Sequence, residues 1–180
     1  DSHIMELPDF LQINAEPKDR DLVPEISFGS AAGSGIDRDL HEYINAGHKH
    51  DANTIAQLTA LGDDILRGPK GYQALGAFAK DDRPAALDML GFKKQLVFAS
   101  FSTGVAFRAD RPELEYAASR AHNRGMADFC NIDARLMGVG VVPLDDPKRA
   151  ISELEFCLDK GLQAIWVPHR NCGGRSPGHD

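Results

Sequence analysis

The chain has 180 residues, of which 42% are hydrophobic, enough apolar material for the core of one domain. Its 27 acidic and 20 basic residues give a formal net charge of −7, which argues against nucleic acid or an anionic membrane as a partner. No stretch approaches the roughly 18 apolar residues of a membrane span, no leader opens the chain, and the three cysteines lack paired spacing, so a cytoplasmic location is expected.

The chain opens on the segment DSHIMELPD, in which a carboxylate and an imidazole lie two residues apart. On a β-strand, Asp1 and His3 point to the same face. If this strand is the first of a barrel, its C-terminal end opens at the catalytic mouth, where a divalent ion would find both side chains as ligands. Taken alone, the pattern also fits a flexible terminus or a tag remnant.

Residues 11–82 are less regular, and we interpret them as an irregular excursion near the catalytic face that includes one helix over residues 52–66. His48 and His50 form a His-x-His pair within it, but a polar helical stretch precedes them instead of an apolar strand. This context favours a surface loop or helix cap over a metal site. The glycine-rich segment at 29–35 lacks the preceding strand and following Lys-Ser or Lys-Thr of a phosphate loop, which argues against a nucleotide-binding domain.

From residue 83 onward, amphipathic helices alternate with apolar strands. We predict helices at 84–90, at 112–131 and from a cap at Asp145 or Asp146 to Gly161, and strands at 95–100, 136–142 and 162–167. Continuous apolar strands joined by helices indicate an α/β fold with a parallel sheet and right-handed crossovers.

The number of strands is small for a complete fold of this class. A (β/α)8 TIM barrel needs eight strands and typically about 250 residues, so residues 1–180 would form a single domain that supplies roughly its N-terminal half. The rival is an open flavodoxin-like sheet, which needs about five strands. The alternative function is a non-catalytic module, either a half-barrel completed by another chain or an inactive binding domain.

The opening segment resembles the D-S-H-x-x-E-P-P-D start of one branch of the amidohydrolase-related, metal-dependent barrel family that includes the aminocarboxymuconate-semialdehyde decarboxylases. Further matches follow in family order. They are Leu90-Gly-Phe with Gln95-Leu-Val-Phe98, His122-Asn-Arg124 with Asp128-Phe-Cys130, Pro143-Leu-x-Asp-Pro147 with Glu153-Leu154 and Gly161, and Val167-Pro-His169 with Gly174-Arg-Ser176 and His179.

The resemblance implies a TIM barrel that holds one divalent metal ion, with Asp1 and His3 as ligands. The family's first strand usually carries His-x-His, so Asp1 makes this site more negative; zinc is favoured and manganese is the alternative. The remaining ligands, a histidine ending the fifth strand and an aspartate ending the eighth, would lie beyond Asp180. The implied activity is hydrolysis or decarboxylation of a small carboxylated aromatic or cyclic substrate, in an enzyme that forms a homodimer.

Two further residues are predicted to bind substrate. His169 follows the last predicted strand, in a loop of the kind that builds barrel active sites, and Glu6 lies just after the ligand strand. The alternatives are a solvated loop histidine and a plain loop carboxylate. Asn123 and Arg124 lie within the long predicted helix, where packing or ion pairing is expected, and Cys157 is expected in the core.

Overall fold

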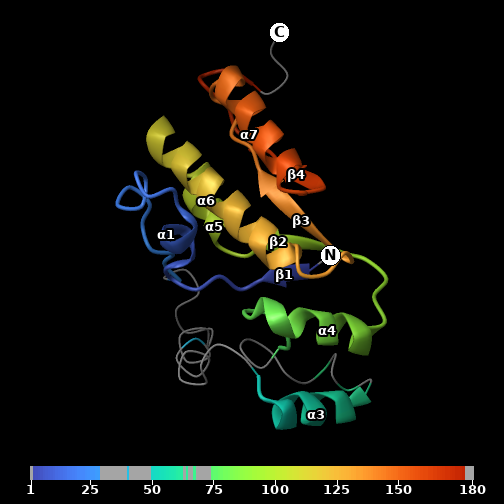
Figure 1. Cartoon of the computed structure of the whole chain (residues 1–180). Coiled ribbons are helices and arrows are strands. Elements are labelled where there is room, and N and C mark those ends of the chain that lie inside the picture. Colours follow the sequence, from blue (N-terminus) through green and yellow to red (C-terminus); the bar gives the residue numbers. More distant parts are fainter. Residues whose placement is uncertain are drawn as a thin grey trace.

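The computed structural model describes residues 2–28, 40, 50–62, 64, 67 and 74–176 (Figure 1). Its strands form one four-stranded sheet in the order β1-β2-β3-β4. They are β1 (Ser2–Ile4), β2 (Gln95–Ala99), β3 (Leu136–Val141) and β4 (Ala164–Trp166), and every neighbouring pair is parallel. The α/β class and the parallel sheet are therefore confirmed.

The helices are α1 (Phe10–Asn14), α3 (Ala52–Ala60), α4 (Arg83–Leu90), α5 (Ser102–Phe107), α6 (Pro112–Cys130) and α7 (Pro147–Asp159), with a 3-10 turn, η4, at Lys80–Asp82. Leu87 of α4, Met126 of α6 and Cys157 of α7 share one core with Val97 and Ala99 of β2. These three helices, each on a connection between consecutive strands, thus cover the same face of the sheet, and Figure 1 shows α6 and α7 beside its β3 and β4 end.

The strand order separates the two folds that the sequence left open. A flavodoxin-like sheet has the order 2-1-3-4-5 and helices on both faces. The described strands instead follow one another in chain order, and the connecting helices α4, α6 and α7 pack on one face. This arrangement is compatible with half of a barrel, although the barrel itself stays a prediction.

The helix boundaries follow from local capping chemistry. Asp146, not Asp145, caps α7, because its carboxylate accepts hydrogen bonds from the N–H groups of Lys148 and Arg149, and Pro147 occupies the first turn. Gly91 ends α4 in the left-handed conformation, with φ of 69°. None of the described helices has the length and hydropathy needed to cross a membrane.

Part of the irregular segment is a packed layer. Leu11 and Ala15 around α1, together with Val23 and Ile26, form a core with Ala residues of α5 and α6. Farther along, α3 ends at Ala60, earlier than the predicted helix over 52–66, and its Leu58 packs against Leu75 and Ala86. The glycine-rich segment at 29–35 and His48 lie outside the described residues.

Two glycines of β3 let helices approach the sheet closely. A Cβ atom on Gly140 would lie 2.9 Å from the Sγ atom of Cys157 in α7, and one on Gly138 would lie 3.0 Å from the Cγ atom of Met126 in α6. Both distances are shorter than a van der Waals contact, so larger side chains would push the helical layer away from the strand.

We expect Gly140→Ala to lower the free energy of unfolding by about 1–3 kcal/mol, as overpacking of a dense core does. Gly104 in α5 is the matched control, because a Cβ atom there would have no neighbour within 4 Å. Gly104→Ala should leave the stability unchanged or raise it by up to about 1 kcal/mol. Urea unfolding of the two variants measures the difference, and equal stabilities would contradict the close packing.

Candidate active site

The carboxyl ends of the four parallel strands meet at one edge of the sheet, which is where α/β folds bind ligands. His3 lies near this end of β1, Ser100 follows β2, Asp145 follows β3, and His169 follows β4. The candidate active site is the set of side chains at this edge.

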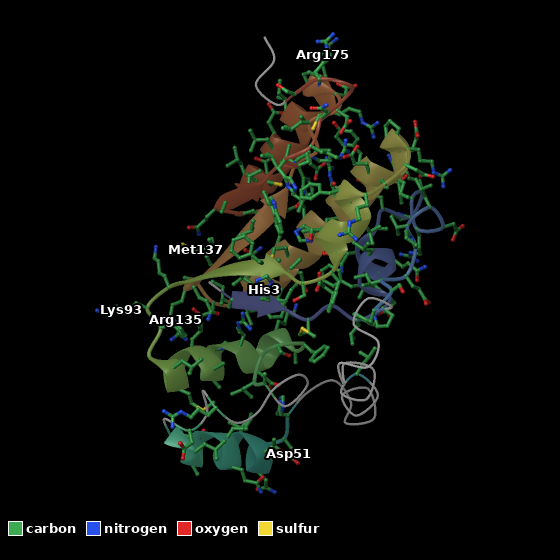
Figure 2. The ribbon with its side chains drawn as sticks, turned by 180° about the vertical axis from the view of Figure 1, so that it is seen from behind. His3, Asp51, Lys93, Arg135, Met137 and Arg175 are labelled. Atoms are coloured by element: carbon green, nitrogen blue, oxygen red, sulfur yellow. The ribbon has the colours of Figure 1, made fainter. Side chains whose placement is uncertain are left out.

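His3 is exposed on the face of the sheet opposite α4, α6 and α7 (Figure 2). Its register partner on β2 is Phe98, and the two rings stack with their centroids 5.7 Å apart. The Nδ1 atom of His3 lies 3.1 Å from the carbonyl oxygen of Ala99. Because a carbonyl oxygen can only accept, this contact selects, for the neutral imidazole, the tautomer with the proton on Nδ1 and the lone pair on Nε2. A metal-binding histidine has this tautomer, often set by a backbone carbonyl.

An aromatic row continues from His3 across the same face. The ring of Phe98 contacts Trp166 of β4 edge-on at a centroid distance of 5.9 Å, and Phe107 of α5 contacts Trp166 at 5.8 Å. Trp166 keeps 36% of its surface exposed. The face without the connecting helices is therefore apolar and aromatic, with the imidazole of His3 at one end.

Glu6, predicted to bind substrate, lies in the interior with an exposed fraction of 1%. Its carboxylate accepts hydrogen bonds from the backbone N–H groups of Ser100 at 3.0 Å, Phe101 at 3.1 Å and Ser102 at 2.8 Å. These contacts fix the turn after β2 against β1. Glu6 thus shapes the edge beside His3 through the backbone.

His169 is exposed in the bend that follows β4, and among the described residues it has no hydrogen-bond partner. Its neighbour Arg170 holds the bend in place: its guanidinium donates to Glu115 at 2.6 Å, to Asp145 at 3.1 Å and to the carbonyl oxygen of Phe107 at 3.2 Å. The imidazole of His169 is therefore open to solvent on an anchored loop.

The carboxylate pair under this loop, Glu115 and Asp145, was not predicted as part of the site. Burial and the negative charge of Asp145 raise the pKa of Glu115 to about 7, although Arg170 opposes the shift. Burial would also raise the pKa of Asp145, but the N–H of Gly173 and the guanidinium of Arg170 lower it below its usual value. Glu115 is therefore expected to take up a proton as the pH falls through about 7, while Asp145 stays ionised.

Ser102 and His122 form a hydrogen bond of 2.7 Å between Oγ and Nδ1, the geometry of a nucleophile and its base. Both side chains are fully buried, however, and burial lowers the pKa of His122. Its Nε2–H donates to the carbonyl oxygen of Val139 at 3.2 Å. The pair links α5, α6 and β3 in the interior and is closed to substrate.

Asn123 has the packing role expected from the sequence. Its Oδ1 atom accepts a hydrogen bond from the N–H of Val141, and its Nδ2 atom donates to the carbonyl of Val141 and to Glu153. His50 lies in the loop directly before Asp51, the N-cap residue of α3, as expected. Its expected place at the surface is wrong, because its side chain is only 7% exposed and its Nδ1 lies 2.8 Å from Oδ2 of the equally buried Asp82.

The predicted metal pair is only half described, because Asp1 lies outside the described residues. Within the part of the chain that is described, no three His, Cys, Asp or Glu side chains form a group that could hold a metal ion. No protein-family model and no curated protein matches the chain. The chemistry of the strand ends is therefore the basis for a functional assignment.

Proposed function

We propose that the chain provides the first four strands of a (β/α)8 barrel and that their carboxyl ends form part of a divalent-metal site. The reaction would be hydrolysis or decarboxylation of a small carboxylated aromatic or cyclic compound. The observation that carries this proposal is His3, whose Nε2 is available as a ligand and whose Nδ1 is held by the carbonyl of Ala99.

The sheet supports the barrel part of the proposal. In a TIM barrel the strands follow chain order, the helices lie outside, and bulky side chains fill the inside. The described sheet has that strand order, and α4, α6 and α7 cover one face. Phe98 and Trp166 on the opposite face would then form part of the packed barrel interior.

The donor chemistry supports the metal part. A neutral imidazole suits zinc and other divalent transition metals, and a carboxylate two residues earlier on an extended strand points to the same face. Asp1 and His3 would hold the ion, with zinc favoured over manganese. Bound there, it would supply Lewis-acid chemistry, which serves both hydrolysis and loss of a carboxyl group.

Three of the motifs that carry the family resemblance lie on a strand of the sheet or directly after one. The opening segment contains β1, the Pro143-to-Pro147 motif follows β3, and the Val167-Pro-His169 motif follows β4. Arg170 anchors the bend that carries His169, which leaves the imidazole free to contact a substrate. This placement supports a substrate-binding role for His169.

Elemental analysis of purified protein that includes the residues beyond Asp180, where the remaining ligands are expected, tests the proposal. After dialysis against zinc or manganese, we expect about one divalent ion per chain, and we expect His3→Ala to weaken the affinity for that ion at least about tenfold, so that the bound ion is lost on dialysis against metal-free buffer. His169→Ala is the matched control: it removes an exposed imidazole at the same edge and should keep the ion. A chain that binds no divalent ion, or binds it equally well without His3, would favour the non-catalytic binding module.

A further inference from the structure

A cavity of about 740 Å³ opens at the C-terminal end of β2, between α5 and residues 24–27. This volume lies within the range of about 300–1,000 Å³ that is usual for small-molecule sites. Its wall includes apolar side chains from three segments, namely Ile26, Phe101 and Leu114. Ser100 also lines it, directly after Ala99, whose carbonyl oxygen holds His3.

Arg108, the C-cap residue of α5, lines the same cavity and is exposed. Among the described residues, no hydrogen bond or ion pair engages its guanidinium. Two other arginines of this region differ in that respect, since Arg120 is paired with Glu153 and Arg170 with Glu115. The guanidinium of Arg108 is therefore available to a ligand.

The charges around the cavity select among anions. A guanidinium matches the planar geometry of a carboxylate with two parallel hydrogen bonds, and Thr103 adds a hydroxyl group to the wall. Glu25 and Asp110 line the cavity as well, and their repulsion of a doubly charged phosphate is about twice that of a singly charged carboxylate at the same place. A singly charged carboxylate on an apolar ring fits both the apolar wall and Arg108, the one cationic side chain among the described residues of the lining.

We propose that this cavity binds a small aromatic carboxylate and that Arg108 holds its carboxylate group. As a substrate subsite it rests on the proposed function, because Ser100 joins the cavity to the edge that carries His3. The prediction that the cavity binds a carboxylate depends only on the shape of the cavity and on Arg108, and not on a metal ion at His3.

Titration of benzoate into the purified chain in EDTA, followed by NMR, tests the proposal. We expect Arg108→Gln to raise the Kd of benzoate about tenfold or more, because a charge-assisted hydrogen bond is lost. Arg124→Gln is the control, since Arg124 is exposed on α6 and does not line the cavity. Benzamide, which has the same ring without the charge, should bind the parent chain and Arg108→Gln equally.

The outcomes separate this inference from the proposed function. Benzoate binding that depends on Arg108 in EDTA supports the cavity site, even if no metal ion binds at His3. Absence of benzoate binding, or equal binding to Arg108→Gln and the parent chain, overturns it. Binding that needs added zinc and His3 but not Arg108 also overturns it, because the metal would then be the carboxylate receptor.

Discussion

Asn123→Ala is expected to lower the free energy of unfolding by at least about 3 kcal/mol. The side chain of Asn123 is fully buried. It makes the two backbone hydrogen bonds to Val141 that a neighbouring strand would otherwise make: Oδ1 accepts from the N–H of Val141 at 2.7 Å, and Nδ2 donates to the carbonyl oxygen of Val141 at 2.8 Å. It also donates to Glu153 at 2.7 Å. In Asn123→Ala, the N–H and the carbonyl oxygen of Val141 and the carboxylate of Glu153 would each lose a buried hydrogen bond. A buried polar group without its hydrogen-bond partner costs about 1–3 kcal/mol.

Urea unfolding monitored by circular dichroism measures this loss. Arg124→Ala is the matched control, because Arg124 is the next residue of α6 and is exposed. Its substitution should change the stability by no more than about 0.5 kcal/mol. If Asn123→Ala lost less than about 1 kcal/mol, the bridge from α6 to β3 would contribute little to the fold.

The stability of the chain is expected to depend on pH through Glu115. Its pKa is about 7 in the folded protein and ordinarily 4.5, so the folded state holds the proton more tightly than the unfolded chain. The contribution of Glu115 to the free energy of unfolding therefore decreases as the pH rises from about 4.5 to 7, and it is nearly constant at higher pH. The change in pKa bounds the effect at roughly 3 kcal/mol.

Glu115→Gln should remove this component, because glutamine stays neutral throughout the range. The measurement is the difference between the unfolding free energies of the parent chain and the variant, from pH 4.5 to 8. Glu113→Gln, an exposed position two residues away, should keep the parent profile. Parallel profiles for the parent chain and Glu115→Gln would show that the cluster with Asp145 and Arg170 holds no proton near neutral pH.

The second half of the fold could be predicted closely from the sequence. The predicted strand at 95–100 is β2 (Gln95–Ala99), and the predicted helix at 112–131 is α6 (Pro112–Cys130). Long periodic segments specify their structure locally, and the proline at the start of α6 marks where that helix begins. By contrast, α1 has five residues and α5 has six, too few for a helical period to stand out.

The candidate site was only partly predictable, for a physical reason. The alternation of side chains along a strand predicts that Asp1 and His3 point to the same face, and this prediction needs only the neighbouring residues of the sequence. The partners of Glu6 lie 94 or more residues away, and Arg170 lies 55 residues from Glu115. No local pattern marks such pairs, so the buried role of Glu6 and the proton-holding pair under the His169 loop emerged only from the three-dimensional arrangement.

The position of β1 in the sheet has a consequence for the order of folding. Val139 and its partner Ala164, which join β3 to β4, are 25 residues apart, whereas Ser100 and Glu6, which hold β1, are 94 apart. Closing the longer loop costs roughly 1 kcal/mol more, because each doubling of length adds about 0.6 kcal/mol. β1 is therefore expected to dock last and to detach first. His3 would then be placed only after the rest of the sheet has formed, so the proposed metal binding, if measured during refolding, is expected to follow the formation of β2, β3 and β4.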